Sequence, residues 1–152
     1  MSLTGTDNFF EDFKPGDLFR HARGKTVTEM DNVLITHLVM NTAQGHFNEH
    51  QMKETEFGHR IVFGGITASM VIGLAYQDTG EQALAELEMD GIRFPSPVFH
   101  GDTLYAYTEV VSAEDGDRPD AGIVTFRHWG VNDRDQIVFE GVRRVLIKRR
   151  PT

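Results

Sequence analysis

The segment at residues 66–77 constrains the fold of this chain more than any other. It has the composition of a helix, and it is apolar nearly all the way round. A helix that lacks a polar face is a buried helix. Gly64 and Gly65 open this segment, and Asp78-Thr79-Gly80 close it. The rest of the chain must therefore cover this one helix. Small residues recur along it at Ala68, Ser69, Gly73 and Ala75.

Strand-like segments follow the helix and predict a sheet around it. These segments are residues 84–94, 103–113, 123–131 and 137–148, with turn-forming clusters between them. The last two are joined by a short polar turn and predict a hairpin. Residues 18–28 predict a further strand before the helix. Together they predict an α+β fold, in which a curved antiparallel β-sheet wraps around a central buried helix.

Two shorter helices are expected before the buried one. Thr28 and Asp31 form a capping-box pattern, and the apolar spacing after it predicts a helix that ends near Met40. Asn48, with Gln51 three residues later, predicts the start of a short second helix.

A single helix covers one face of a sheet and leaves the sheet edges open. We therefore expect two copies to pair through an edge strand into a homodimer. The length of 152 residues predicts one domain spanning residues 1–152.

Composition excludes several classes of function. The chain has no Cys, which rules out a disulfide scaffold, a thiolate metal site and a thiol nucleophile. The absence of Cys also fits a cytoplasmic location. A net charge of -8 argues against a nucleic-acid surface. Neither a secretory signal nor an apolar run of membrane-spanning length is expected.

Basic residues gather near the C-terminus. The expected role of this cluster is protective charge on a solvated edge strand. The alternative is a contact with the phosphates of a CoA-like ligand. The cluster consists of Arg143, Arg144, Lys148, Arg149 and Arg150.

The polar loop at residues 41–48 carries the predicted chemistry. His46 can take and return a proton near neutral pH without a metal. Asn41 can hold a water through its amide oxygen, although it cannot accept a proton. The backbone N–H groups of Gly64 and Gly65 head a helix and can bind a developing oxyanion. These groups suffice to add water to an activated acyl group, or to remove it.

The same residues resemble the MaoC-like, (R)-specific enoyl-CoA hydratases. That family carries a Gly-Asp-x-Asn-Pro-x-His-x-Asp loop and then a Phe-Gly-(Arg/Lys)-Pro-Ile-x-His-Gly run. With the loop histidine on His46, the family's Phe-Gly falls on Phe57-Gly58 and its helix-opening Gly on Gly64. Pro97-Val-Phe-His-Gly101-Asp102-Thr is similar to the second family signature.

The resemblance covers nearly the whole chain, and it implies both a fold and a reaction. The fold is the hot-dog fold. The activity is that of a hydro-lyase acting on the α,β double bond of an acyl-CoA thioester, with no cofactor other than the coenzyme A of the substrate. Two alternatives remain: a hot-dog acyl-CoA thioesterase, and a non-catalytic acyl-CoA-binding subunit.

One departure from the family pattern matters for the mechanism. The catalytic Asp of the family falls on Asn41, so the carboxylate of the Asp–His pair is missing. This form is similar to the mesaconyl-CoA hydratases (beta-methylmalyl-CoA dehydratases), which act on small branched dicarboxylic acyl thioesters. Either His46 works alone in acid–base catalysis, or Glu49 or Glu54 replaces the lost acid.

The predicted site has a catalytic and a substrate-binding part. Arg60 or Arg93 is a candidate to hold a second substrate carboxylate by a forked contact. His46 and His50 have the spacing of a metal pair, but the helix start between them and the lack of a third ligand argue against a metal. The predicted catalytic residues are Asn41, His46 and Gly64, and the predicted substrate-binding residues are Phe47, Arg60, Phe63 and Gly65.

Overall fold

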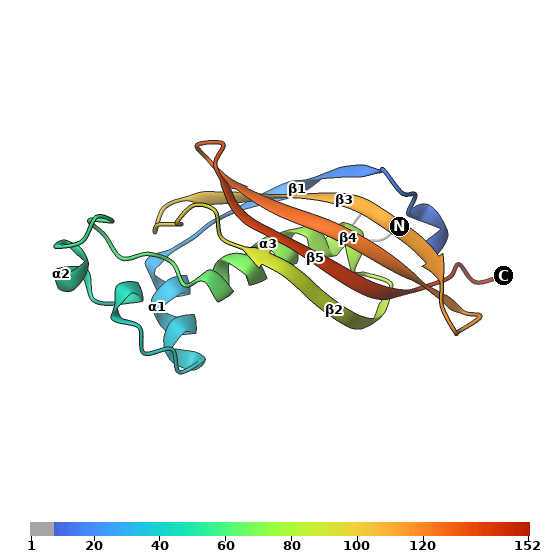
Figure 1. Cartoon of the computed structure of the whole chain (residues 1–152), viewed down its shortest axis with the longest axis horizontal. Coiled ribbons are helices and arrows are strands. Elements are labelled where there is room, and N and C mark those ends of the chain that lie inside the picture. The colour runs from blue at the N-terminus through green and yellow to red at the C-terminus, as the bar shows by residue number, and fades with distance from the viewer. Residues whose placement is uncertain (1–7) are drawn as a thin grey trace.

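The computed structural model describes residues 8–152, and its centre is a five-stranded antiparallel sheet packed on one long helix (Figure 1). The strands lie in the order β1-β3-β4-β5-β2. This arrangement confirms the α+β fold that the sequence predicts. The strands are β1 (Leu18–Thr26), β2 (Ala83–Arg93), β3 (Thr103–Asp115), β4 (Ala121–Asn132) and β5 (Ile137–Lys148).

Local sequence signals set the ends of the helices. The Thr28 hydroxyl accepts the N–H of Asp31, and the Asp31 carboxylate accepts the N–H of Thr28, so the predicted capping box is confirmed. The Asn48 side chain likewise accepts the N–H of Gln51 and begins the second helix. The helices are α1 (Glu29–Leu38), α2 (Glu49–Met52) and α3 (Gly64–Thr79), with short 3-10 turns η1 (Phe10–Asp12) and η2 (Gln44–His46).

Helix α3 is the predicted apolar helix, and it packs with one face on the sheet. Ile66, Val71 and Ala75 are buried in one cluster with residues of β3 and β5. Gly130 of β4 allows this close approach, because a Cβ there would collide with the Val71 side chain. The expectation of complete burial holds for this face only. A single sheet cannot cover the opposite face, where Ser69, Gly73 and Tyr76 are exposed.

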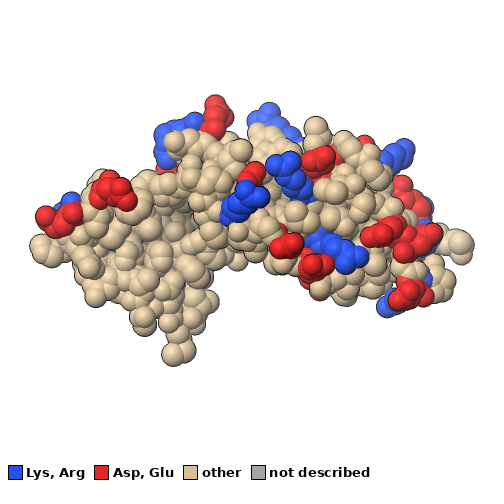
Figure 2. Space-filling model, viewed as in Figure 1, with Lys and Arg blue, Asp and Glu red and all other residues tan. Residues whose placement is uncertain are grey.

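Helices α1 and α2 lie beyond the end of the sheet at which α3 begins (Figure 1). These helices form a lobe, and the lower part of this lobe shows no charged side chains in Figure 2. The most exposed apolar residues of α1 and of the turn that follows it are Met30, Leu38 and Met40, whose exposed fractions are 73%, 72% and 85%. Exposed apolar surface of this kind is typical of a surface that contacts another chain.

The basic C-terminal segment does not form the edge strand that we expected. β5 lies between β4 and β2, so the edge strands are β1 and β2. Arg143 of β5 is buried, and its guanidinium forms an ion pair with Glu86 of β2. The other arginines of the cluster also pair with acids: Arg144 with Glu88 and Glu114, Arg149 with Glu11 and Asp115, and Arg150 with Asp12.

A chain of hydrogen bonds crosses the interface between the sheet and the C-terminal end of α3. Arg143 Nη1 donates to His128 Nε2 at 3.2 Å, which leaves the proton of a neutral His128 on Nδ1. That proton is donated to the Thr108 hydroxyl at 2.7 Å. Thr108 in turn donates to His21 Nε2 at 2.7 Å, and His21 Nδ1 donates to Asp78 at 2.6 Å. The five side chains therefore share one direction of donation.

Burial keeps His128 neutral in this chain of hydrogen bonds. Burial first, and then the charge of Arg143, lower the pKa of His128 well below its usual value. Protonation would also put a hydrogen on His128 Nε2, which would then face the N–H donor of Arg143 Nη1 with no acceptor between them. The folded state therefore resists protonation at this position.

In the part of the chain that the structure describes, no helix is long and apolar enough to cross a membrane.

We predict that His128 makes the fold sensitive to acid. The unfolded chain takes up a proton on this histidine near pH 6.5, about its ordinary pKa, while the folded chain does not. Its contribution to stability is therefore complete above that pH and falls as the pH drops below it. Between about pH 7.5 and about pH 5.5, the free energy of unfolding of the native protein should fall by about 1.4 kcal/mol more than that of His128→Gln. Urea unfolding at both pH values measures this difference.

The control is His50→Gln, which removes an exposed histidine outside the network. It should keep the pH dependence of the native protein. Equal pH dependence in the native protein and in His128→Gln would contradict the prediction.

Candidate functional site

A cleft of about 330 Å³ opens beside the N-terminus of α3. It brings together His46 from η2, Gly64 and Thr67 from the first turn of α3, and residues of the segment that follows β2. Two residues from the predicted catalytic set, His46 and Gly64, thus line one cleft. The other residues that line it are Phe57, Ile61, Val62, Phe94, Ser96, Pro97, Val98 and Val138.

The imidazole of His46 is held in one tautomer. Its Nδ1 lies 2.9 Å from the carbonyl oxygen of Ile61, and a carbonyl can only accept, so Nδ1 carries the proton. Nε2 is then left with a lone pair that can take a proton. Ile61 also holds the loop that carries His46, because the N–H of Ile61 donates to the carbonyl of Gly45 at 3.0 Å. The His46 ring also lies 5.6 Å from the ring of Phe63.

The first N–H groups of α3 remain available to a ligand. The helix begins after Phe63, whose side chain caps nothing, and the N–H groups of Ile66 and Thr67 both donate to the Phe63 carbonyl. Within residues 8–152, the N–H groups of Gly64 and Gly65 donate to no acceptor. These donors sit at the positive end of a 16-residue helix, a place that favours negative charge.

Both glycines lie close to aromatic rings. A Cβ on Gly64 would lie 3.1 Å from the Phe94 ring, which also lines the cleft, so a side chain would narrow the cleft at this point. A Cβ on Gly65 would lie 2.7 Å from the Phe63 ring, inside van der Waals contact. Phe63 and Gly65 adjoin the cleft without lining it.

Thr67 is a cleft residue that the sequence analysis missed. It is only 2% exposed, and its hydroxyl takes part in no hydrogen bond among the described residues, although it lines the cleft. The signal that identifies it is its spacing, because Thr67 lies three residues after Gly64 and so on the same face of α3. Pro97 and Val98, the first two residues of the second family signature, also line the cleft but were not predicted as part of the site.

Three residues predicted for the site lie elsewhere: Asn41, Phe47 and Arg60. The side-chain oxygen of Asn41 accepts the N–H of Ala43 at 2.9 Å, so it closes the turn after α1 and does not line the cleft. Phe47 packs on His37 with ring centroids 4.7 Å apart and lines a groove along α1. The structure therefore does not bring the Asn41 amide and the His46 ring onto one cleft wall.

Arg60 is held by two carboxylates of this chain. Its Nε donates to Glu49 and its Nη1 to Glu29, both at 2.7 Å, which ties α1 to α2. Hydrogen bonds from His59 and then Arg60 lower the pKa of Glu49 to about 2. Glu49 is therefore a poor proton acceptor near neutral pH. Arg60 and Glu49 lie outside the His46 cleft, as do the exposed Glu54 and Arg93.

The described residues offer no arrangement for a metal ion. Within residues 8–152, no group of three His, Cys, Asp or Glu side chains is placed to hold one. His46 lies in η2 and His50 in α2, with the Asn48 cap between them.

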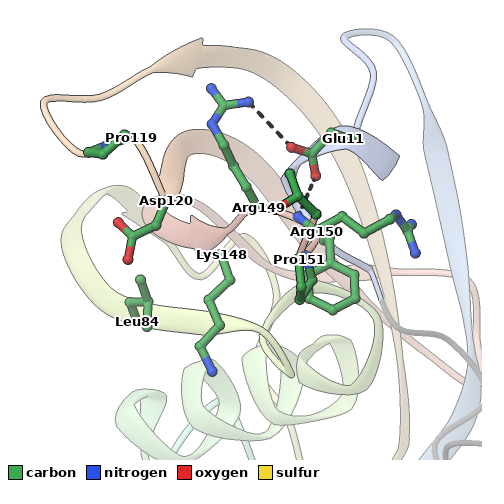
Figure 3. Close-up of a pocket in the computed structure, with 10 residues that line it drawn as sticks. Glu11, Leu84, Pro119, Asp120, Lys148, Arg149, Arg150 and Pro151 are labelled. Atoms are coloured by element: carbon green, nitrogen blue, oxygen red, sulfur yellow. Dashed lines mark hydrogen bonds and ion pairs between the residues drawn. The ribbon is translucent and has the colours of Figure 1, made fainter.

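A second hollow, near the C-terminus, is lined by charged residues, and its two arginines are paired with Glu11 (Figure 3). Arg149 Nη1 lies 3.3 Å from a Glu11 carboxylate oxygen, and the N–H of Arg150 donates to the same carboxylate at 2.9 Å. Arg149 and Arg150 also lie over the rings of Phe10 and Phe9. These contacts occupy the arginines, so they lend no support to a phosphate site for a CoA-like ligand.

The sequence of this chain is similar to those of several known proteins. A family profile described as mesaconyl-CoA hydratase matches residues 6–149. A beta-methylmalyl-CoA dehydratase of Chloroflexus aurantiacus is 34% identical over 136 residues, which cover 88% of this chain and 38% of the dehydratase. An (R)-specific enoyl-CoA hydratase of Rhodospirillum rubrum is 32% identical over 146 residues, which cover 94% of each chain.

A solved structure supports the architecture. A Mycobacterium tuberculosis protein with a double hot-dog fold superposes with a TM-score of 0.87 at 23% identity, over 99% of this chain and 46% of that chain. This superposition confirms the hot-dog fold that the sequence predicts. The chain spans only 38% and 36% of the length of two of the curated relatives that it matches.

Proposed function

This chain belongs to the mesaconyl-CoA hydratase family, and from that premise we propose that it is a hydro-lyase acting on acyl-CoA thioesters. It would add water across the α,β double bond of the acyl group, or remove it. The names of its relatives favour a small, branched, dicarboxylic acyl group of the mesaconyl-CoA kind. The observation that carries the proposal is that His46, with its available Nε2, and the N-terminus of α3 share one cleft.

The reaction needs a base for water and a stabiliser for negative charge. In the hydration direction, His46 Nε2 takes a proton from the water that attacks the β-carbon, and it returns that proton to the α-carbon. In between, negative charge builds on the thioester oxygen. We expect the N–H groups of Gly64 and Gly65 at the start of α3 to donate to that oxygen, and the dipole of α3 to add to the effect.

In this mechanism His46 works without a neighbouring carboxylate from its own chain. The side-chain oxygen of Asn41 accepts the N–H of Ala43 within its own loop, and Glu49 is paired with Arg60. The polar side chain best placed to orient the attacking water is Thr67, because its hydroxyl lines the cleft and takes part in no hydrogen bond among the described residues. The proposed reaction requires no separate cofactor, and a cytoplasmic location belongs to the same proposal.

The proposal includes a homodimer formed through β2. Within residues 8–152 this strand pairs only with β5, so its other edge is open there. Leu87, Met89, Ile92 and Phe94 of this strand and its end are 46%, 50%, 45% and 47% exposed. An open edge strand with large apolar side chains tends to pair with another chain. Because Phe94 also lines the cleft, a partner on β2 would complete the cleft wall.

Hydrolysis of the thioester is the second candidate activity, because the hot-dog fold also hosts thioesterases. The observation that favours it is the same oxyanion site at α3. The two activities differ in product, since hydrolysis releases a free thiol, whereas hydration removes the conjugated absorbance of the thioester and leaves it intact. A non-catalytic acyl-CoA-binding subunit would show neither signal.

We predict that His46→Gln lowers kcat for hydration by about 10²- to 10⁴-fold, the usual contribution of a positioned acid–base group. Asn41→Ala should change kcat far less, because the Asn41 amide lies outside the cleft. The measurement is the loss of conjugated-thioester absorbance with a panel of unsaturated acyl-CoA substrates, with thiol release recorded in parallel. Equal activity of the native protein and His46→Gln would sink the proposed chemistry.

We predict that Gly64→Ala impairs catalysis although α3 stays folded. The added methyl group would lie 3.1 Å from Phe94 and obstruct approach of the thioester to the helix N-terminus. The loss in kcat should reach about 100-fold, as for a lost oxyanion donor. Gly73→Ala in the same helix is the matched control, because its Cβ meets nothing within 4 Å. That control should keep native activity and gain roughly 0.4–1 kcal/mol in stability.

We predict that Met89→Lys converts the dimer to a monomer. A charge in the middle of the β2 edge opposes pairing with a second apolar edge. Light scattering coupled to size-exclusion chromatography measures the mass of the species. Val111→Lys is the control, because Val111 is 49% exposed but lies on the inner strand β3. A native protein that elutes as a monomer would contradict the dimer proposal.

A further inference from the structure

Asn32 of α1 is a fully buried side chain to which the sequence analysis gives no role. Its Nδ2 lies 3.0 Å from the carbonyl oxygen of His46, 3.2 Å from that of Ile61 and 2.9 Å from His100 Nε2. Its Oδ1 accepts the N–H of Phe63 at 3.0 Å. One amide thus contacts three segments that are separated in the sequence, at residue 46, residues 61–63 and residue 100.

Three of these contacts belong to parts of the proposed catalytic site. His46 carries the base itself. The Ile61 carbonyl also accepts the His46 Nδ1 proton, and so it fixes the tautomer that leaves Nε2 available. Phe63 is the residue from which α3 begins, and it directly precedes Gly64. The Asn32 amide therefore connects the base, the acceptor that orients the base, and the start of the oxyanion helix.

An amide carries both kinds of group that these partners need: the two N–H groups of Nδ2 are shared among three acceptors, and Oδ1 accepts from Phe63. The two backbone carbonyls need donors, and the Phe63 N–H needs an acceptor, so the side chain must carry both on adjacent atoms. An Asp would keep the acceptor and lose the donors, while an Ala would lose both. His100 fits the same pattern, because burial and the charge of Arg60 lower its pKa and favour a neutral ring that can accept.

We propose that Asn32 is a positioning residue: it holds the His46 imidazole in its Nδ1–H tautomer and sets that ring at a fixed place relative to the first turn of α3. This inference rests on the proposed function for its effect on rate, but its effect on the imidazole does not depend on the substrate. Asn32 touches no reacting atom, and it acts through the backbone of residues 46, 61 and 63. Small errors in such placement are costly, since a displacement near 1 Å can lower a rate by about 100-fold.

The test compares Asn32→Ala and Asn32→Asp with the native protein. Two-dimensional ¹H–¹⁵N spectra of the imidazole report the tautomer of His46, and steady-state kinetics report kcat and KM separately. We expect one Nδ1–H tautomer in the native protein and a mixture of tautomers in both variants. We expect kcat to fall by up to about 100-fold, with a much smaller change in KM.

Thr79→Val is the matched control for a purely structural effect. Thr79 is also a buried polar residue, but it lies at the far end of α3, where its hydroxyl donates to the Ala75 carbonyl and accepts from Arg143. This variant should lower the free energy of unfolding while it keeps the native kcat and the native His46 tautomer.

The outcomes separate this inference from the proposed function. A folded Asn32 variant with native kcat and a single His46 tautomer would overturn the positioning role. If neither variant folds, the native spectrum decides, because a mixture of tautomers there would also overturn it. A native protein that is inactive on every thioester would refute the proposed function instead, and the tautomer comparison would still decide the role of Asn32.

Discussion

The packing of one face of α3 against the sheet is the interaction on which the rest of the structure depends. It buries Ile66, Val71 and Ala75 against strands that come from the second half of the chain, and the burial of such apolar area is the main favourable term in folding. The packing needs close approach, and Gly130 permits it by leaving room for Val71. Once α3 is fixed in this way, its two ends lie at opposite ends of the sheet. The cleft with His46 lies at the N-terminal end, and the buried chain of hydrogen bonds lies at the C-terminal end.

At each of these ends, the direction of the hydrogen bonds decides which atoms remain available. At the C-terminal end, Arg143 can only donate, and this fixes the proton on every group as far as Asp78. At the N-terminal end, the Ile61 carbonyl can only accept, and this fixes the proton of His46 on Nδ1. The first arrangement pairs both ring nitrogens of His21 and of His128 and serves stability. The second leaves one imidazole nitrogen and two backbone N–H groups unused, and these are the groups that the proposed chemistry requires.

A sheet with one long helix leaves apolar surface uncovered, and this constraint links fold to function. The outer face of α3, the free edge of β2 and the exposed side of α1 all carry apolar residues in the single chain. The β2 edge ends at Phe94, which is also a wall of the cleft. The proposed dimer contact and the proposed substrate cleft therefore share Phe94, and a partner there would affect the shape of the cleft. The relatives that are more than twice as long as this chain are consistent with a fold that is used in pairs.

The sequence by itself determined the main helices and strands of the fold, and it pointed to His46 and Gly64, which line one cleft. The capping box at Thr28, the cap at Asn48, the apolar run of α3 and the β4–β5 hairpin are local signals, because each depends on residues close together in the chain. The tertiary structure alone decided what those residues contact. It placed β5 inside the sheet and gave Arg60 two carboxylate partners. It also directed the Asn41 amide toward Ala43 in its own loop. It also brought Thr67 to the cleft and Asn32 to the residues around His46. Strand order and side-chain pairing depend on contacts between residues far apart in the chain, and no pattern of nearby residues encodes such contacts.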